Sequence, residues 1–336
     1  MLIQERGGRN LLISHIADSD GIGSLVLCRL NPFECNNDVL LVKTHNLHNV
    51  IVDLKNKNFY RDFRGYSKIY ISDLSIQENI ARLIDSSPEL RKRILNFDHH
   101  CINYDTKKFE FVHSVCEKNG IKNSGTSLFY EYLLRKYPYD AIINSKKIRG
   151  FVEAIRSYDN FEHVISGDFT GKYLGYLLCC MGISKYVSRF EKVLSEETDK
   201  DLSFSKTENE IILNFERREE RYINECDKNL IRIRIRRHMV GVSLSNKFKS
   251  SVGYELSRRH KSELDYIMIF DPNIRSFSLR TANELDLSKI VREISGAGGG
   301  LKQAAGGPFN EQSYWIYNEV MKKAAFEGKS GLVKIK

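Results

Sequence analysis

The sequence contains little proline and no long apolar run. Proline accounts for 5 of the 336 residues, whereas apolar residues make up 41% and charged residues 28%. This balance excludes a collagen-like, low-complexity or disordered chain, and the length is comfortable for two domains. The most apolar stretch, 173–183, is much shorter than the ~20 residues of a membrane-spanning helix. No basic segment followed by an apolar run opens the sequence, so we expect neither a signal peptide nor a membrane partner.

Paired cysteines and an acidic excess are also missing. The seven cysteines form no Cys-X-X-Cys pair, and their odd number cannot pair completely within the chain. We therefore expect reduced thiols and a cytoplasmic protein. Asp and Glu number 43 against 52 Lys and Arg, which leaves a net charge of +9. That charge favours polyanionic partners such as nucleic acid or nucleotides, but it indicates no chemistry.

Short apolar segments alternate with amphipathic segments in the first half of the chain. The apolar segments predict buried strands at 10–14, 39–43, 68–72 and 94–97. The amphipathic segments predict helices at 21–30, 50–57 and 76–84. This alternation predicts an α/β fold with an N-terminal, doubly wound, mostly parallel sheet covered on both faces. Such sheets bind ligands at the carboxyl ends of their strands.

The pattern becomes mainly helical after residue 124. It ends in a charged segment, 208–228, that predicts a solvent-exposed connecting helix. Residues 231–236 alternate Ile and Arg, as a half-exposed strand does; the alternative is that these arginines line a nucleic-acid groove. We expect a hairpin with strands at 264–270 and 274–280, and then a helix at 286–294. The expected segments are a first domain, a helical linker and a smaller α/β domain, at 1–190, 191–235 and 236–325.

Acidic and histidine residues stand where strands are expected to end. Because the carboxyl ends of parallel strands meet at one edge, we expect six candidate metal ligands to converge there: His15, Asp18, Asp20, Asp73, His99 and Asp159. Four carboxylates at one place raise one another's pKa unless cations neutralise them. Two divalent ions offset these four charges. Oxygen and imidazole donors favour manganese or magnesium, with zinc or cobalt as alternatives.

Each of these residues has a commoner role when it is taken alone. Asp18 and Asp20 are candidate caps of the helix that follows them, and a single histidine is usually a core or surface residue. The segment 124–127 precedes a helix, and we interpret it as an N-cap, with a phosphate contact as the alternative. The joint order HxxDxDG, D, DHH, D favours a metal site.

Two motifs far apart in the chain point to one superfamily. The first is the triplet Asp98-His99-His100, preceded by the acidic motifs above. The second is Arg280 followed by Gly298-Gly299-Gly300 and, at 304–306, by Ala-Ala-Gly. In this order they resemble the DHH phosphoesterase superfamily with its DHH-associated C-terminal domain. The length and the segment 252–256 are most similar to the nano-RNase, or oligoribonuclease, branch; RecJ-like exonucleases share its catalytic parts.

The resemblance implies a role for each residue of the first motif set. The six ligands would hold two divalent ions, best Mn2+ with Mg2+ or Co2+ as alternatives: His15 and Asp18 on one ion, Asp20, His99 and Asp159 on the other, and Asp73 between them. Asp98 would position His99 from behind the metal. His100 would face the substrate phosphate as a catalytic residue.

The second motif is expected to bind substrate. The resemblance implies that Arg280, Gly298–Gly300 and Lys302 hold the terminal phosphate or nucleotide, since glycines let backbone N–H groups approach an anion. Leu301 stands where the signature has histidine. Leucine cannot donate a hydrogen bond to phosphate, so Lys302 is the expected substitute.

Together these features predict a hydrolase of phosphodiester bonds. The leading hypothesis is a two-metal exonuclease that degrades short single-stranded RNA or DNA, or dinucleotides, to mononucleotides. One alternative is a cyclic-dinucleotide or phosphonucleotide phosphohydrolase, and inorganic pyrophosphate is a less favoured substrate. The alternative of another class is a non-catalytic nucleic-acid-binding protein with a vestigial site. The sequence leaves the oligomeric state open, with a homodimer as one alternative.

Overall fold

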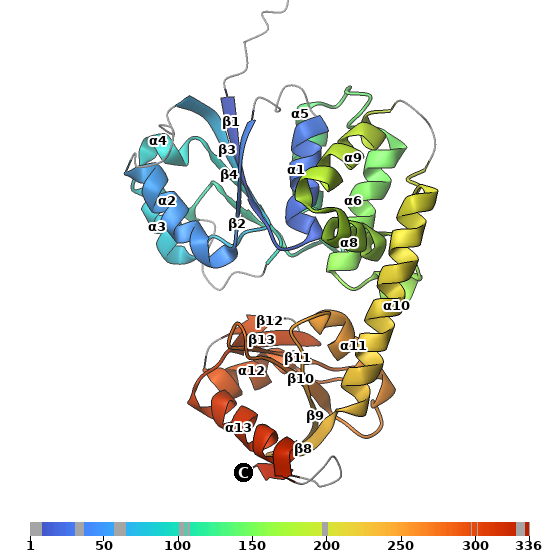
Figure 1. Cartoon of the computed structure of the whole chain (residues 1–336). Coiled ribbons are helices and arrows are strands. Elements are labelled where there is room, and N and C mark those ends of the chain that lie inside the picture. The colour runs from blue at the N-terminus through green and yellow to red at the C-terminus, as the bar shows by residue number, and fades with distance from the viewer. Residues whose placement is uncertain are drawn as a thin grey trace, which may run out of the picture. The chain divides into compact units, whose positions relative to one another are not determined.

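The computed structural model describes residues 9–30, 37–56, 65–100, 105, 108–196, 201–296, 298–300, 302–326 and 333–335. The chain divides into two compact units between Ile212 and Leu213, inside the long helix α10 (Lys206–Lys228), which is yellow in Figure 1. Within the described ranges, no helix is both long and apolar enough to cross a membrane. The expected boundaries at 190, 235 and 325 remain predictions.

The first unit contains a five-stranded sheet in which all neighbouring strands are parallel. In spatial order the strands are β2 (Asn37–Val42), β1 (Arg9–His15), β3 (Tyr66–Ser72), β4 (Ile94–Asp98) and β5 (Val112–Ser114). The predicted parallel α/β sheet is therefore confirmed. The strand order reverses between β1 and β3, which is the position where open α/β sheets bind ligands.

Helices lie on both sides of this sheet (Figure 1). One side carries η1 (Thr44–Asn46), α2 (Leu47–Lys55), α3 (Glu78–Asp85) and α4 (Pro88–Arg91). The other side carries α1 (Ser19–Leu30), α5 (Gly125–Lys136), α6 (Lys146–Asp159), α8 (Thr170–Met181) and α9 (Ile183–Ser195). The short elements are β6 (Glu117–Lys118), β7 (Ile121–Lys122) and α7 (His163–Ser166).

Apolar alternation in the strands explains this layering. Leu11, Ile13, Ile69 and Ile71 point to the side of α2 and α3 and share a buried apolar core with these helices. Side chains two residues apart in a strand point to the same face, so the intervening residues face α1. The buried strands of a parallel sheet need apolar residues on both faces, as the sequence has.

Helix α1 is enclosed by protein along its whole length. All of its residues except Arg29 are buried. Gly21 allows the helix to start close behind β1, because a Cβ at this position would lie 2.1 Å from the carbonyl oxygen of His15. The end of β1 and the first turn of α1 are therefore held side by side, together with the acidic residues between them.

The second unit contains a mixed seven-stranded sheet. In spatial order the strands are β12 (Gly299–Gly300), β13 (Ala304–Pro308), β11 (Ser276–Arg280), β10 (Tyr266–Asp271), β9 (His238–Leu244), β8 (Ile231–Ile235) and β14 (Val333–Ile335). β10 and β11 form the predicted antiparallel hairpin. The helices are the remainder of α10, α11 (Lys249–Arg259), α12 (Leu287–Ser295) and α13 (Glu311–Phe326).

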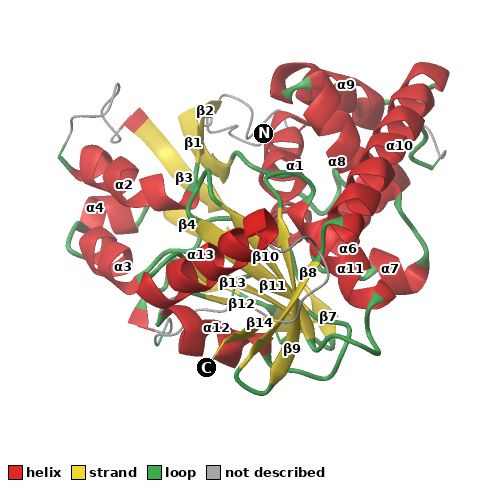
Figure 2. Cartoon of the chain, turned by 60° about the horizontal axis from the view of Figure 1, so that its bottom comes forward, coloured by secondary structure: helices red, strands yellow, loops and turns green. Residues whose placement is uncertain are grey.

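Strand β10 has an apolar core on each of its faces. Met268 and Phe270 share a core with residues of α12 and α13. Ile267 and Ile269 point the other way, into a core with residues of α10 and α11. Figure 2 shows the helices and strands of the chain, coloured by type, from a second direction. The complete burial of β10 makes it the central strand of the unit.

Strand β8 has the predicted alternation of a half-exposed strand. Ile233 and Ile235 are buried, whereas Arg232 and Arg234 are exposed. Arg232 lies 3.4 Å from Glu263 in an exposed ion pair. The strand ends at Ile235, one residue before the predicted end. The solvated-face interpretation of these arginines is therefore sufficient, and no groove is needed to explain them.

Candidate metal centre

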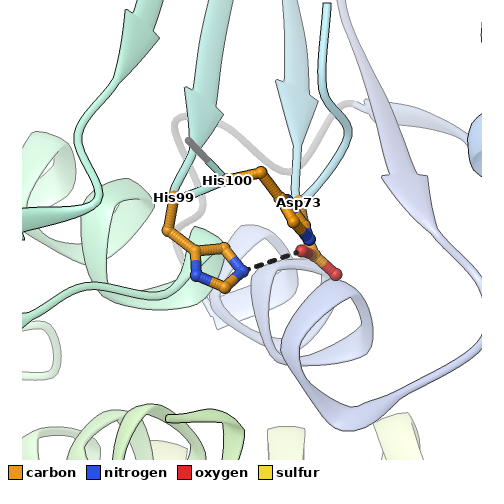
Figure 3. A group of neighbouring side chains, drawn as sticks. All are labelled: Asp73, His99 and His100. Carbon is orange, nitrogen blue, oxygen red and sulfur yellow. Dashed lines mark ion pairs between the residues drawn. The ribbon is translucent and has the colours of Figure 1, made fainter. Parts of the chain in front are cut away.

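Three strand ends of the first unit bring the predicted ligands to one place. His15 is the last residue of β1, Asp73 follows β3, and His99 follows β4. β3 pairs with β1 on one side and with β4 on the other, so the three ends are neighbours. Figure 3 shows Asp73, His99 and His100 lying together, with an ion pair between His99 and Asp73. The cluster occupies the point where the strand order reverses.

The structure brings all six predicted ligands into overlapping groups. In each group the potential ligand atoms lie within 4.8 Å of one another: His15, Asp18 and Asp73; Asp20, His99 and Asp159; Asp73, His99 and His100. Asp73 Oδ2 lies 3.4 Å from His15 Nδ1, and Asp73 Oδ1 lies 3.5 Å from His99 Nε2. One carboxylate therefore joins two groups, as a bridging ligand would. The ligand roles themselves remain predictions.

Asp159 reaches the cluster from a helix, which corrects the expectation that it follows a strand. It is the last residue of α6, and its Oδ2 lies 3.5 Å from His99 Nε2. The segment before it, Arg156 to Tyr158, belongs to the same helix. The physical reason is that α6 packs beside α1 and α5 and ends at the rim of the sheet.

Asp73 adopts a backbone conformation that is unusual for a residue with a side chain. Its φ is 54°, in the left-handed region, and its N–H donates to the carbonyl oxygen of Phe97 at 2.9 Å. Such conformations cost of order 1–3 kcal/mol and concentrate at functional sites. The side chain is 3% exposed, and among the described residues its Oδ2 has no hydrogen-bond partner. This carboxylate oxygen is buried without the hydrogen bond that buried polar atoms normally have.

Asp20 is fixed by the amino end of a helix distant in sequence. Its two carboxylate oxygens accept hydrogen bonds from the backbone N–H groups of Gly125 and Thr126, at 2.6 and 2.8 Å. Ser124 caps the same helix through a reciprocal bond with Ser127, which confirms the N-cap interpretation. Free N–H groups at a helix start favour a negative charge. Helix α5 thus orients Asp20 at the cluster.

Asp18 combines a capping role with a place in the cluster. Its Oδ1 accepts hydrogen bonds from the backbone N–H groups of Asp20 and Gly21 at the start of α1. Its Oδ2 lies 3.1 Å from His15 Nδ1. The two interpretations of Asp18 that the sequence left open, helix cap and metal ligand, are therefore compatible, because each uses a different oxygen.

The carboxylates raise the pKa of both buried histidines. The hydrogen bond to Asp18 and then the nearby carboxylate of Asp73 raise the pKa of His15 to about 10. Burial lowers the pKa of His99, but the surrounding carboxylates, with Asp73 foremost, outweigh burial and raise it to about 10. In the metal-free protein both imidazoles therefore carry a proton at neutral pH.

The pKa values of the buried carboxylates shift in opposite directions. Burial raises the pKa of Asp20 well above its ordinary range, and burial raises that of Asp159 to about 6. Burial also raises the pKa of Asp73, but the ion pairs with His15 and His99 outweigh burial and hold that pKa well below its usual range. Protons on the histidines thus offset the negative charge of the cluster. A divalent cation offers the same compensation in their place.

Asp98 contacts His100, which corrects the expectation that it positions His99. Asp98 Oδ1 lies 2.7 Å from His100 Nδ1, and Ser75 donates to its Oδ2 at 2.9 Å. Asp98 is the last residue of β4, and the chain bends at His100, two residues further on. The Asp98 side chain is fully buried, whereas the His100 side chain is 54% exposed. A buried carboxylate therefore holds an accessible imidazole.

The donor set of the cluster fits a divalent cation. It consists of carboxylate oxygens and imidazole nitrogens, which suit manganese or magnesium better than a soft metal. Asp73 Oδ2, which has no hydrogen bond among the described residues, is an atom that such an ion would satisfy. If such an ion binds, the six predicted ligands are the residues expected to contact it. Asp98 and Ser75 would contact the ion only indirectly, because Ser75 donates to Asp98 and Asp98 holds His100.

The predicted substrate residues of the second unit lie around one strand. Arg280 ends β11 and is paired with Ala304 of β13, while Gly300 of β12 is paired with Ala305. Burial lowers the pKa of Arg280 to about 10. Gly298 and Gly300 have φ values of 102° and 139°, which only glycine adopts readily. The glycine loop and Arg280 therefore flank β13, and Lys302 beside them is exposed. Leu301 lies outside the described residues.

The sequence indicated residues 124–127 as a helix cap or a phosphate contact, but it did not indicate that Gly125 and Thr126 hold Asp20. It did not indicate Ser75 at all. Ser75 stands only two residues after Asp73, and this closeness in sequence was the one feature that could have indicated it. The backbone contacts of Gly125 and Thr126 to Asp20 span more than a hundred residues, and no local pattern encodes such a pairing.

The first unit thus carries a cluster of acidic and histidine residues beside its strand ends, and a smaller mixed-sheet unit follows it. No protein-family model and no curated protein matches the sequence. The structure is similar to that of a DHH domain from a protein described as a member of a family of ribosomal proteins, with 13% identity over 96% of this chain and 88% of that chain and a TM-score of 0.60. This likeness shows the fold.

Two further solved structures share this fold. Exonuclease RecJ bound to manganese is 12% identical over 96% of this chain and 91% of that chain, with a TM-score of 0.53. RecJ from Thermus thermophilus in complex with Mn2+ is 10% identical over 98% of this chain and 54% of that chain, with a TM-score of 0.52. The chain therefore has the fold of DHH-domain proteins, which confirms the predicted fold class.

Proposed function

We propose that the protein is a metal-dependent phosphodiesterase of the DHH type that hydrolyses short single-stranded oligonucleotides to mononucleotides. The observation that carries the proposal is the position of Asp73, which is buried between His15 and His99 and has one carboxylate oxygen without a hydrogen bond among the described residues. RecJ structures of the same fold, solved with manganese, support an exonuclease-type reaction. The choice of short substrates follows the resemblance to the oligoribonuclease branch.

The six ligands would hold two divalent ions. When bound, such ions supply positive charge that stabilises a phosphoryl group and the groups attacking and leaving it. Asp73 would contribute to both positions, and Asp20, fixed by the start of α5, would keep its carboxylate in place without reorganisation. The other ligands divide between the two ions according to the groups described above. His15 and Asp18 would contact one ion, and His99 and Asp159 would contact the other together with Asp20.

His100 is proposed to act on the substrate phosphate. Its Nδ1 lies 2.7 Å from Asp98 Oδ1 and its side chain is 54% exposed, so Nε2 is the nitrogen that we propose for contact with the substrate. Burial lowers the pKa of His100, but the hydrogen bond that the ring donates to Asp98 outweighs burial and raises it. A protonated ring can donate to a phosphate oxygen or to the leaving oxygen. Asp98 is thus a positioning residue and His100 the catalytic residue.

The second unit is proposed to recognise the substrate end. Arg280 and the N–H groups of Gly298–Gly300 would bind a terminal phosphate or nucleotide, with Lys302 as an additional cation. Arg280 is held by Ser250 at 3.2 Å and by close packing against Gly253, where a Cβ would lie 2.6 Å from the Arg280 side chain. Such a fixed guanidinium suits recognition of an anion.

A product time course tests the proposal. End-labelled single strands of graded length, a duplex and cyclic dinucleotides are incubated with the full chain and manganese, and then with a chelator. We expect mononucleotides from the shortest strands first, poor cleavage of the duplex, and no reaction with the chelator. If a cyclic dinucleotide is cleaved faster than the linear strands, the proposed substrate is wrong. If none of these substrates is cleaved in a chelator-sensitive way, the proposal that the protein is a metal-dependent phosphodiesterase is wrong.

A further inference from the structure

The second unit has a cavity that the proposed function does not use. It has a volume of about 410 Å3 and is lined by Arg275, Phe309, Asn310, Glu311 and Tyr314. We propose that this cavity binds a nucleobase of single-stranded nucleic acid, with the adjoining phosphate on Arg275. The inference goes beyond the proposed function, since it concerns binding without catalysis, and it rests on that function only for the choice of a nucleic acid.

Aromatic side chains form a continuous wall from the core to this cavity. Phe309 and Tyr317 both pack against the fully buried Phe270, with ring centroids 5.4 and 5.5 Å away. Tyr314 is stacked on Tyr317 at 6.2 Å and lies 6.4 Å from Phe309. The Tyr314 side chain is nevertheless 54% exposed. A ring that is fixed from behind and open in front is suited to stack on a base.

Arg275 supplies a cation whose backbone is fixed. It has a φ of 48° in the turn between β10 and β11, and its carbonyl oxygen accepts a hydrogen bond from the N–H of Phe309 at 2.9 Å. This bond ties the turn to the aromatic wall. The side chain is exposed, and within the described part of the chain no carboxylate lies within ion-pair distance of it. A guanidinium without an ion pair to any described carboxylate, beside aromatic rings, can bind the phosphate that adjoins a stacked base.

The cavity is separate from the predicted end-binding residues of the same unit. Arg275 and Arg280 stand at opposite ends of β11, and Phe309 directly follows the last residue of β13. Five residues of extended strand correspond to roughly 16 Å. A nucleotide held by Arg280 therefore does not fill this cavity, and a longer strand is needed to occupy both.

The charge of the second unit favours a polyanion over an uncharged peptide. Residues 213–336 contain 23 Lys and Arg against 15 Asp and Glu, whereas residues 1–212 contain 29 against 28. Nearly all of the net positive charge thus belongs to the unit with the aromatic cavity. A proline-rich peptide, which also binds aromatic grooves, gains nothing from that charge. Glu311 can accept a hydrogen bond from a base amino group, which favours adenine, cytosine or guanine over uracil.

Binding in the absence of metal tests the proposal without hydrolysis. Labelled single strands of about 12 nucleotides, as RNA in one arm and DNA in the other, are titrated with the full chain in chelator, and anisotropy is recorded. We expect Tyr314→Ala to weaken binding by about 10-fold or more and Tyr314→Phe to retain it, since stacking needs only the ring. Arg275→Ala should also weaken binding and reduce its salt dependence.

Matched variants separate this site from general effects. Tyr139→Ala removes a tyrosine that is 97% exposed in the first unit, and Arg292→Ala removes an exposed charge from the second; both should change affinity less than about twofold. The single tryptophan, Trp315, follows Tyr314 and is 46% exposed, so its quenching by unlabelled strands gives a second readout.

Three results would overturn the proposal. These are unchanged binding by Tyr314→Ala with intact folding, equal losses in the control variants, and Tyr314-dependent binding of a proline-rich peptide but not of either strand. A failure to hydrolyse oligonucleotides would contradict only the proposed function, because this assay contains no metal. Conversely, loss of strand binding by Tyr314→Ala with normal hydrolysis of a dinucleotide would support both.

Discussion

Asp73 is the residue on which the candidate centre depends most. Its strained backbone, its burial and its unpartnered oxygen are each unfavourable for stability, yet they occur in one residue. The pattern of the sequence predicted that Asp73 follows a strand and meets five other ligands. It could not predict the left-handed conformation, because that conformation is imposed by the Phe97 contact and by the close approach of α5.

We predict that Asp73→Asn abolishes both metal binding and activity. Loss of one carboxylate between two groups should remove the increase in Tm that manganese causes in the wild type, worth ~2.7 kcal/mol at a hundredfold excess over its Kd. Activity should fall by more than about tenfold. Asp53→Asn, an exposed aspartate on α2, is the control and should behave as wild type. Retention of manganese stabilisation by Asp73→Asn would exclude a bridging role.

His100→Ala should separate catalysis from metal binding. Because His100 is held by Asp98 and is half exposed, we expect the Tm increase with manganese to persist while the rate falls by roughly 10²- to 10⁴-fold. The exposed His48→Ala on α2 is the matched control. His100 also lies within ligand distance of Asp73 and His99. Loss of the manganese effect would therefore identify it as a ligand.

Asp98→Asn tests the positioning role that the structure assigns to Asp98. The carboxylate raises the pKa of His100, so its removal should lower that pKa. If His100 acts as a protonated donor, the alkaline limb of the rate profile moves to lower pH, and manganese binding stays unchanged. A merely structural role would lower Tm without moving the profile. The local spacing of Asp98 and His100 predicts this contact better than it predicts contact with His99.

Elements of the first unit were predictable because their signals are local. Apolar runs located the strands, and the predicted helices at 21–30, 50–57 and 76–84 begin or end within a few residues of α1, α2 and α3. The contact between Asp20 and the start of α5 was not predictable, since it joins segments more than a hundred residues apart. Helix packing, rather than sequence pattern, also brings Asp159 from the end of α6.

Gly125→Ala should show how closely α5 approaches the centre. A Cβ at this position would lie 2.7 Å from the Cβ of Asp73 and 2.8 Å from its backbone nitrogen, so a backbone has to move. We expect a loss of ~1–3 kcal/mol in stability and a lower affinity for manganese. Gly150→Ala on α6, where nothing lies within 4 Å, should instead stabilise the protein by ~0.5–1 kcal/mol. Melting curves with and without manganese measure both; equal effects would refute the close approach.

The whole molecule distributes its chemistry and its charge unevenly. The acidic and histidine cluster belongs to the first unit, which is almost electrically neutral, while the second unit carries nearly all of the net charge. Total composition indicated a polyanionic partner but not where it binds, because a net charge averages over both units. The aromatic cavity of the second unit likewise could not be predicted from the sequence, because Arg275 and Phe309 become neighbours only through the β11–β13 pairing.

The stability of the molecule should depend on pH with opposite signs in the metal-free and metal-loaded states. The raised pKa of His15, about 10, means that its ion pairs stabilise the metal-free fold fully below its unfolded pKa. This contribution is lost as the pH rises through about 10, and the same holds for His99. A metal needs both imidazoles unprotonated, so binding releases protons and strengthens as the pH rises.

We therefore expect the increase in Tm caused by manganese to be larger near pH 8 than near pH 6, while the metal-free Tm falls over that interval. Asp159, with a pKa raised to about 6, adds to the effect because it too must lose its proton. Melting curves in chelator and in manganese across this range provide the measurement, and calorimetry in two buffers of different ionisation enthalpy counts the protons released. A manganese effect independent of pH, with no proton release, would show that the ion does not bind among these histidines and carboxylates.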